Sequence, residues 1–345
     1  MNIVLTGGGS AGHVTPNIAL LPYLKKQFKT ISYIGSKDGI EKQLIEKQKI
    51  PYYSITTCKL VRSFNLKNFL LPLKLLKGIV EAKKILKKLK PNIIFSKGGF
   101  VSVPVVIAAH QLKIPIIAHE SDYSLGLANK IIYNFCNIMC FTFNNVPSKY
   151  KSKSIVTGSP IRQDIISKNK INFKNNKKTI LIMGGSLGAK AINELIFNNI
   201  DQLLNKYNII HIVGKNNLNN ELKTKNNYIQ FEYTNNIGEL FNSCNIVISR
   251  AGSNTIFELL ALNKPMILIP LPKTSSRGDQ IENAKYFKIN NYANVIYQEN
   301  LTINILLNTI EKTLNSNYNK QLTQNPFKAN NDISEIIKNY SNNKY

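Results

Sequence analysis

Short apolar runs, many of them rich in isoleucine and valine, alternate with longer amphipathic stretches along most of this 345-residue chain. Alternation of this kind is typical of parallel βαβ units and predicts an α/β fold. In the first half of the chain the predicted strands cover residues 2–6, 30–34, 52–56, 92–95, 115–118 and 137–141. In the second half they cover residues 179–183, 209–213, 228–231, 245–249, 266–269 and 294–297.

A polar run rich in Asn and Lys, residues 167–178, interrupts this periodicity and indicates a surface connection between two domains. The length and the 43% hydrophobic content also leave room for about two cores. We expect an N-terminal domain of residues 1–162 and a C-terminal domain of residues 163–345. A last helix, over residues 333–340, could pack back on the N-terminal domain.

Both halves open in the same way, with a predicted strand, a glycine loop and a helix. The first loop is residues 7–13 (GGGSAGH) and the second is residues 184–189 (GGSLGA). Glycine lets backbone N–H groups approach a ligand closely, and the helix N-terminus that follows favours a diphosphate. Two such loops predict two Rossmann-like domains that face each other across a cleft.

The first loop also satisfies the dinucleotide fingerprint through Gly7, Gly9 and Gly12, so a nicotinamide or flavin enzyme is an alternative. Such enzymes carry an acidic residue at the end of the second strand, where it binds the ribose. Here the second predicted strand ends without one, and Asp38 lies just beyond it. The fingerprint alone is a weak signal, and a glycine turn that only packs a helix on a strand remains open.

A third cluster, residues 249–255 (SRAGSNT), follows a predicted strand and opens a helix that carries Glu258. Its small and hydroxyl residues suit phosphate binding through backbone amides, and Glu258 could accept both hydroxyls of a ribose. An ordinary helix N-cap would need no ligand. Farther on, Gln280 and Asn283 share one helical face, which suits either sugar hydroxyls or solvent.

With 45 Lys and Arg against 19 Asp and Glu, the net charge is +26, which favours nucleic acid, anionic lipid or polyanionic substrates as partners. A general bias toward Asn, Ile and Lys accounts for much of that lysine. Without an RNP-type aromatic motif or zinc-finger spacing, the sequence argues against a nucleic-acid binder. The four arginines, whose planar fork suits phosphate, lie in or beside the segments singled out here: Arg62, Arg162, Arg250 and Arg277.

The chain shows no secretory signal and no apolar run near the roughly 18 residues of a membrane-spanning helix, so we expect it in the cytosol or on its membrane surface. We also expect buried free thiols, because the cysteines are scattered without a Cys-x-x-Cys pair. They are Cys58, Cys136, Cys140 and Cys244.

Seven short stretches, taken together and in order, resemble the MurG family of GT-B glycosyltransferases. They are residues 7–13, 97–102 (KGGFVS), 119–122 (HESD), 126–130 (GLANK), 158–162 (GSPIR), 184–189 and 250–252 (RAG). The resemblance implies an N-terminal acceptor domain for lipid I and a C-terminal domain for UDP-N-acetylglucosamine. It also implies an inverting transfer of N-acetylglucosamine to the C4 hydroxyl of the muramyl sugar of lipid I, which forms lipid II, with no metal or cofactor.

The resemblance further implies a donor site in which Glu258 binds the ribose, Thr234 lies by the uracil, and Arg162 and Ser186 lie near the diphosphate. The other implied donor residues are Ser10, Ala11, Gly12, Ser253, Asn254, Thr255 and Gln280. Some members of the family carry an asparagine where Asp122 stands, in a stretch that touches the sugar, so the role of Asp122 stays open.

Deprotonation of the attacking hydroxyl calls for a base that titrates near neutrality, and histidine suits that task. His13, at the end of the first loop, is the candidate. His119 competes, because the adjacent Glu120 could raise its basicity. His110 and His211 lie in apolar stretches and are interpreted as structural.

A lipid-linked acceptor requires contact with an anionic membrane surface, expected at the cytoplasmic face of the cell membrane. A helix predicted from Pro72 places Leu75, Ile79, Ala82, Leu86 and Leu89 on one stripe facing the core. The apolar residues outside that stripe, with basic neighbours, are the predicted membrane contact: Phe64, Leu66, Phe69, Leu70, Leu71 and Leu73. A buried loop is the alternative for this segment, and a diacylglycerol glycosyltransferase is the alternative enzyme.

Overall fold

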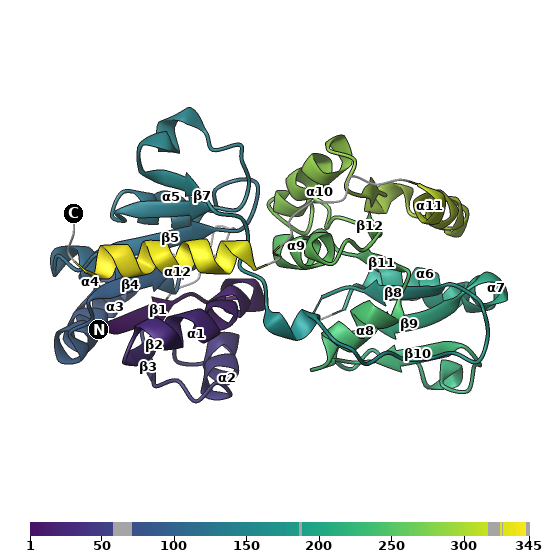
Figure 1. The fold of residues 1–345 in the computed structure, drawn as a ribbon, viewed down its shortest axis with the longest axis horizontal. Helices are drawn as coiled ribbons and strands as arrows, with labels where there is room; N and C mark the ends of the chain where they lie inside the picture. The colour runs from purple at the N-terminus through teal and green to yellow at the C-terminus, as the bar shows by residue number, and fades with distance from the viewer. Residues whose placement is uncertain (58–70, 186–187, 317–324, 326, 343–345) are drawn as a thin grey trace. The chain divides into compact units, whose positions relative to one another are not determined.

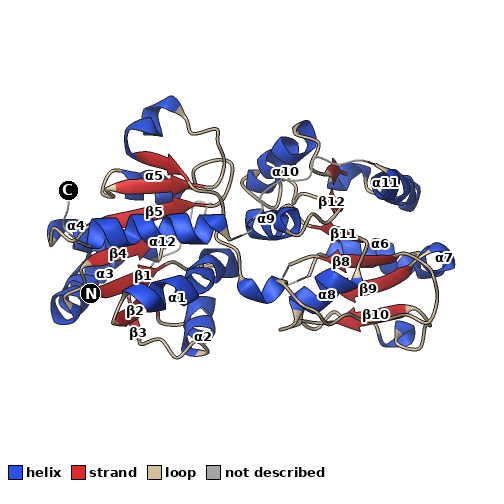
Figure 2. Ribbon diagram, in the orientation of Figure 1, coloured by secondary structure: helices blue, strands red, loops and turns tan. Residues whose placement is uncertain are grey.

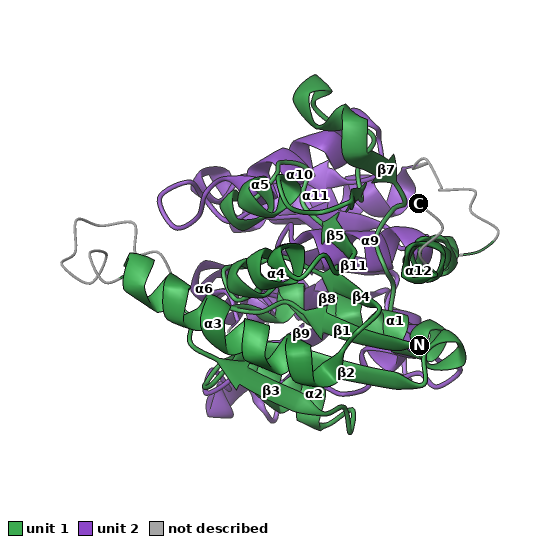
Figure 3. Ribbon diagram, turned by 90° about the vertical axis from the view of Figure 1, so that its left-hand side faces the viewer, with its two compact units in different colours: residues 1–162, 325–345 green, residues 163–324 purple. Residues whose placement is uncertain are grey.

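A computed structural model describes residues 1–57, 71–185, 188–316, 325 and 327–342 of the chain (Figure 1). The chain divides into two compact units, shown in different colours in Figure 3. Unit 1 combines Met1–Arg162 with Asn325–Tyr345, and unit 2 is Gln163–Gln324. Each unit holds one parallel β-sheet with helices packed on it (Figure 2), so the predicted α/β class is confirmed.

The sheet of unit 1 has the strand order β3-β2-β1-β4-β5-β6-β7, and every neighbouring pair is parallel. Its strands are β1 (Asn2–Thr6), β2 (Thr30–Ser36), β3 (Tyr52–Ile55), β4 (Ile93–Ser96), β5 (Ile116–Glu120), β6 (Ile138–Phe141) and β7 (Ser154–Val156). Six were predicted to within two residues at each end. The edge strand β7 was missed, because three residues are too few for a periodic signal.

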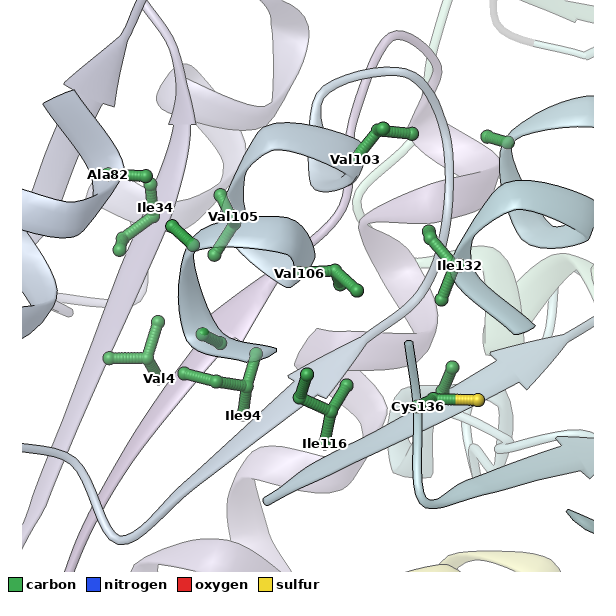
Figure 4. Close-up of a cluster of buried hydrophobic side chains, with 14 of the residues drawn as sticks. Val4, Ile34, Ala82, Ile94, Val103, Val105, Val106, Ile116, Ile132 and Cys136 are labelled. Carbon is green, nitrogen blue, oxygen red and sulfur yellow. The ribbon is translucent and has the colours of Figure 1, made fainter. Parts of the chain in front are cut away.

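Alternation along β1 explains why unit 1 has a core on each face of its sheet. Val4 belongs to one cluster of buried side chains, whereas Ile3 and Leu5 belong to the other. Figure 4 shows the first cluster, in which strand residues such as Ile94 meet helix residues such as Val106. The helices of unit 1 are α1 (Thr15–Gln27), α2 (Ile40–Glu46), α3 (Leu71–Leu89), α4 (Ser102–Gln111), α5 (Leu127–Tyr133) and α12 (Lys328–Ser341).

The last helix, α12, packs against α1 within unit 1, where Ile333 and Ile337 join the second core cluster. Its buried Asn330 is the main polar contact. The side-chain amide donates to the carbonyls of Ala19 at 3.0 Å and Ile161 at 2.9 Å, and its oxygen accepts from the Ile161 amide at 2.9 Å. Asn330 thereby fixes the C-terminal helix to the residue that precedes Arg162, the end of the first segment of unit 1.

Replacing Asn330 with alanine is expected to lower the free energy of unfolding by about 2–4 kcal/mol, because the Ile161 amide and carbonyl lose a buried partner and the Ala19 carbonyl, inside α1, loses an additional one. Urea denaturation followed by circular dichroism measures this change. Asn331→Ala is the control, since Asn331 lies next to it on α12 with an exposed side chain. An equal decrease in the free energy of unfolding in both variants would show that the Asn330 hydrogen bonds do not stabilise the fold.

Unit 2 repeats the architecture with the strand order β10-β9-β8-β11-β12-β13, again parallel throughout. The strands are β8 (Thr179–Met183), β9 (Asn208–Ile212), β10 (Tyr228–Phe231), β11 (Ile246–Ser249), β12 (Met266–Leu268) and β13 (Asn294–Val295). The helices are α6 (Lys190–Asn198), α7 (Ile200–Lys206), α8 (Ile237–Ser243), α9 (Ser253–Ala261), α10 (Asp279–Ile289) and α11 (Ile303–Asn315). Helices α6, α7 and α11 share a core with the strands, and the six predicted strands are confirmed to within two residues.

Three cysteines, Cys136, Cys140 and Cys244, are buried free thiols as expected, and Cys58 lies outside the described residues. Burial raises the pKa of the Cys136 and Cys140 thiols to about 12, so both stay protonated at neutral pH. Within the described residues, no helix is both long enough and apolar enough to cross a bilayer.

Candidate functional site

The two glycine loops occupy equivalent places in the two sheets. In unit 1 the first loop follows β1 and residues 97–99 follow β4, and these adjacent strands mark the point where the strand order reverses. In unit 2 the second loop follows β8 and residues 250–252 follow β11, at the corresponding point. Ligands of open parallel sheets bind outside the carboxyl ends of the strands at such a point. Topology thus makes both loops candidate ligand sites.

Buried polar side chains hold the start of the first loop. The Tyr33 hydroxyl donates to the Gly7 carbonyl at 2.7 Å, and the Asn17 amide donates to that hydroxyl at 3.2 Å and to the Thr6 carbonyl at 3.3 Å. Burial raises the pKa of Tyr33 far above its ordinary value, so the phenol stays a neutral donor. These hydrogen bonds therefore hold the start of the first loop in place without a ligand.

A carboxylate also binds the first loop. The Gly9 amide donates to Glu41 Oε2 at 3.2 Å, and the other carboxylate oxygen accepts from the amide and the hydroxyl of Ser36. The acid near the end of β2 is thus Glu41 rather than Asp38, and it binds the loop itself. This arrangement contradicts the dinucleotide alternative, in which that acid would be directed at a ribose.

His13 closes the loop in a short 3-10 turn, Ala11–His13, with its side chain partly exposed. Its Nδ1 lies 3.2 Å from the backbone carbonyl of Lys97. Because a carbonyl only accepts hydrogen bonds, Nδ1 must carry the hydrogen, and the lone pair of the neutral ring is on Nε2. This tautomer leaves Nε2 as the atom that can take a proton from a substrate.

His119, the competing base, is completely buried. Its Nε2 donates to the Gly158 carbonyl at 3.0 Å. Burial, together with the nearby Lys97 ammonium, holds the pKa of His119 well below its ordinary value. A neutral imidazole without solvent contact cannot meet a substrate hydroxyl directly, so the geometry favours His13.

Glu120 serves as a brace for the loop that follows β5. One carboxylate oxygen accepts from the Asp122 amide at 3.0 Å, and the other accepts from the Gly126 amide at 3.0 Å and the Asn129 side chain at 2.9 Å. With its oxygens engaged in this way, Glu120 shapes the stretch that presents the partly exposed Asp122.

Lys97 is buried at the end of β4, a position that the sequence analysis recognised only as part of a motif. Its ammonium donates to the Ser121 hydroxyl and so joins the loops after β4 and β5. Burial lowers the pKa of Lys97 to about 8, although Glu120 and Asp122 act in the opposite direction.

In unit 2, Arg250 is a structural brace. The guanidinium donates to the carbonyls of Ile269 at 3.2 Å and Pro270 at 3.4 Å, and to Gln298 Oε1 at 2.7 Å. It therefore ties the carboxyl ends of β11 and β12 together, which corrects the expectation of a phosphate-binding fork at this position. Arg277 forms a surface ion pair with Asp279 at 2.8 Å, and Arg62 lies outside the described residues.

The third cluster forms the start of α9, where Gly252 is the N-cap and has no side chain that could bind the first-turn amides. Ser253 and Glu258 are buried on this helix, with Glu258 only 8% exposed, and Asn254 and Thr255 are partly buried. A helix N-terminus with this cap suits an anion. A buried carboxylate one turn farther on suits a pair of hydroxyl donors.

Helix α10 is bound to the same edge of the unit 2 sheet. The buried Asn283 side chain donates to the Ala251 carbonyl at 3.2 Å, and Gln280 Oε1 accepts from the Leu271 amide at 3.0 Å. The interpretation of Asn283 as a solvated or sugar-binding residue is therefore wrong. Gln280 is thereby held against the loop that follows β12.

The remaining candidates are distributed over both units. Thr234 follows β10, and its hydroxyl accepts from the Asn236 amide at 2.9 Å just before α8. Arg162, partly buried, ends the first segment of unit 1. Ser10, Ala11 and Gly12 lie in the first loop of unit 1, and Ser186 lies outside the described residues. The described residues hold no cluster of three or more His, Cys, Asp or Glu side chains placed for a metal ion.

His211 and His110 differ in their surroundings. His211 is buried between Tyr228 and Asn193, and burial lowers its pKa to about 3, which confirms a structural role. His110 is exposed at the end of α4, where its ring meets the edge of Phe135.

The predicted membrane contact is only partly within the described residues. Phe64, Leu66, Phe69 and Leu70 lie outside them, Leu71 is partly buried, and Leu73 is exposed on the first turn of α3. The stripe predicted to face the core is confirmed, since Ala82 and Leu86 are buried in the first cluster with the other three packed against it.

An exposed apolar row lies elsewhere on α3. Leu73, Leu76 and Val80 are 64%, 59% and 54% exposed, and their spacing of three and four residues places them on one face. The sequence analysis did not pick out Leu76 or Val80, which the 3.6-residue period would have grouped with Leu73.

Comparison with known proteins agrees with this architecture. The model of the glycosyltransferase family 28 N-terminal domain matches residues 3–140, and that of the family 28 C-terminal domain matches residues 179–340. A relative from Clostridium botulinum strain Alaska E43 is 52% identical over 97% of this chain and 96% of its own. A second, from strain Langeland, is 50% identical over 98% of this chain and 99% of its own. Both are named UDP-N-acetylglucosamine--N-acetylmuramyl-(pentapeptide) pyrophosphoryl-undecaprenol N-acetylglucosamine transferase.

Among solved structures, MurG of Acinetobacter baumannii superposes with a TM-score of 0.75 at 25% identity, covering 98% of this chain and 99% of that one. The calicheamicin glycosyltransferase CalG4 shares the fold alone, with a TM-score of 0.74 at 8% identity. The expected GT-B fold, built from two Rossmann-like domains, is thereby confirmed. Since both family 28 domains match and half of the residues are identical to those of the bacterial transferases over nearly the full length, the chain belongs to the MurG family within glycosyltransferase family 28.

Proposed function

We propose that this protein is the transferase that moves N-acetylglucosamine from UDP-N-acetylglucosamine to the C4 hydroxyl of the muramyl sugar of lipid I, forming lipid II. The observation that carries this proposal is the roughly half-identical sequence shared with transferases of that name over nearly the whole chain. The geometry supports it, because a candidate base closes the glycine loop of unit 1 and a helix N-terminus with a buried carboxylate lies at the matching edge of unit 2.

Most of the contacts to the donor nucleotide are assigned to unit 2. The amides at the start of α9, from Ser253 to Thr255, and Ser186 of the second loop hold the diphosphate with Arg162. Glu258 accepts the two ribose hydroxyls, and Thr234 lies by the uracil. The NH₂ group of Gln280 donates to a sugar oxygen, and Ser10, Ala11 and Gly12 of the first loop complete the contact with the donor.

Transfer with inversion then divides between the two units. His13 Nε2 takes the proton of the C4 hydroxyl as that oxygen attacks C1 of N-acetylglucosamine from the face opposite UDP. Negative charge that develops on the departing diphosphate is stabilised by the N-terminus of α9 and by Arg162. The backbone carbonyl of Lys97 holds the ring of His13 in the required tautomer.

A direct assay tests the proposal. The purified chain is incubated with UDP-N-acetylglucosamine labelled in the sugar and with either lipid I or diacylglycerol in detergent. Labelled lipid II and an equivalent amount of UDP are expected with lipid I alone. Transfer to diacylglycerol but not to lipid I would reject the assignment in favour of a glycolipid synthase.

The apolar row of α3 is proposed to contact the membrane that carries the acceptor, at the cytoplasmic face of the cell membrane. Leu73, Leu76 and Val80 are exposed, and Lys74 and Lys77 are exposed beside them. Apolar side chains insert at the lipid interface while neighbouring cations meet anionic headgroups, each for about 1 kcal/mol.

Replacing Leu73, Leu76 and Val80 with serine is expected to weaken binding to anionic phospholipid vesicles roughly 100-fold, because each side chain loses about 1 kcal/mol of apolar transfer. Vesicle co-sedimentation measures the effect, and activity on a water-soluble acceptor analogue should be unchanged. The control replaces three exposed apolar residues of unit 2, Ile166, Leu218 and Ile289, with serine. Equal vesicle binding by the α3 variant and the wild type would refute this surface.

A further inference from the structure

Glu41 stands out because it is a completely buried carboxylate that the proposed reaction does not use. It lies in the first turn of α2, and its oxygens accept from the amide of Gly9 and from both the amide and hydroxyl of Ser36. None of the described lysines or arginines pairs with it. Its charge is therefore stabilised mainly by groups of the glycine loop and of the turn after β2.

The backbone around Glu41 leaves room only for its carboxyl group. A Cβ at Gly8 would lie 2.6 Å from the carboxyl carbon, and a Cβ at Gly39 would lie 2.2 Å from Oε1. Gly9 has a positive φ of 83°, which turns its amide toward Glu41 and is costly for any other residue. The loop is thus shaped around this side chain.

A chain of close contacts leads from this carboxylate to the ring of His13. Glu41 fixes the peptide between Gly8 and Gly9, and the Gly8 carbonyl packs against Gly99, where a Cβ would lie only 2.2 Å from that oxygen. The same added Cβ would lie 3.1 Å from His13 Cδ2, so the ring rests on Gly99 as well. The Gly8 carbonyl and the ring of His13 therefore both pack against Gly99, and a shift of the loop displaces both.

We propose that Glu41 is a positioning residue for the transfer: its carboxylate anchors the first glycine loop and thereby holds His13 where Nε2 meets the acceptor hydroxyl. This inference rests on the proposed function, in which His13 is the base.

Glu41→Gln tests the proposal, because it preserves the size of the side chain but replaces one acceptor oxygen by an NH₂ group that cannot accept from Gly9 or Ser36. With the full-length protein we expect kcat to fall 10- to 100-fold while the dissociation constant for UDP, whose assigned contacts lie outside the first loop, stays within twofold. Glu46→Gln is the matched control, since Glu46 is exposed on the same helix. A kcat within threefold of wild type, or an equally large rise in the dissociation constant for UDP, would overturn the proposal.

Two further variants keep the test decisive. If Glu41→Gln does not fold, Ser36→Ala removes one donor to the carboxylate, and a 3- to 10-fold lower kcat at an unchanged dissociation constant for UDP is expected. An unchanged kcat overturns the proposal. His13→Ala separates the two levels of inference. If His13→Ala is impaired and Glu41→Gln is not, only the positioning role fails, whereas a fully active His13→Ala removes the assigned base.

Discussion

Replacing His13 with alanine is expected to lower kcat by roughly two to four orders of magnitude, the usual contribution of a positioned general base. The dissociation constant for UDP should change little, because the His13 side chain is not among the groups assigned to the nucleotide. Steady-state transfer to lipid I gives kcat, and isothermal titration with UDP gives the dissociation constant. A lower kcat at an unchanged dissociation constant indicates a chemical role for His13, whereas a change in both would indicate loss of the binding site.

His110→Ala is the control for this experiment, since His110 is the other histidine in unit 1 with solvent contact. It lies on α4 with its ring against Phe135, far along the helix from the loop that follows β4. Activity close to wild type is expected there. A His13→Ala enzyme that retained more than a third of the wild-type kcat would show that another group, or water, accepts the proton.

Glu258→Ala is expected to raise the dissociation constant for UDP roughly 100-fold, equivalent to about 2.7 kcal/mol. A hydrogen bond to a charged group contributes about 1.5–3 kcal/mol, and the carboxylate is assigned to two ribose hydroxyls. Isothermal titration with UDP measures the change, and Glu258→Gln should fall between the alanine variant and wild type. Glu221→Ala provides the control, because Glu221 is an exposed acid of the same unit.

Two results would contradict the assignment of Glu258. Unchanged affinity for UDP in a folded variant would remove this carboxylate from the donor site. Equal loss of affinity for UDP and for 2′,3′-dideoxy-UDP would mean that Glu258 acts on the shape of α9 rather than on the ribose. The contrast follows from geometry, since a nucleotide without those hydroxyls has nothing to donate to Glu258.

Strand positions and fold class could be predicted because they depend on local periodicity. Residues 179–183 form a run of apolar side chains between polar stretches, and they fold as β8. The glycine loops were equally accessible, because a strand, a glycine turn and a helix follow one another directly along the chain. Once the strand order is known, the same local signals place both loops at the reversal points of the two sheets.

Contacts between distant segments could not be predicted from such patterns. Glu41 lies 32 residues from Gly9, whose amide donates to its carboxylate, and Asn330 lies 169 residues from Ile161. In sequence, Glu41 is one acid among the charged residues of a short helix, and its burial depends on Gly8 and Gly39 closing around it. The structural role of Arg250 was missed for the same reason, because the carbonyls that it binds lie at the end of another strand.

The division of the chain into units has a consequence for biosynthesis. Unit 2 is one uninterrupted segment, whereas unit 1 needs its C-terminal helix α12, which supplies Ile333 and Ile337 to the core beside α1. Domains generally fold as they leave the ribosome. Here residues 1–162 are translated before unit 2 but need α12, which is translated after it, so unit 2 can reach its native state before unit 1 does.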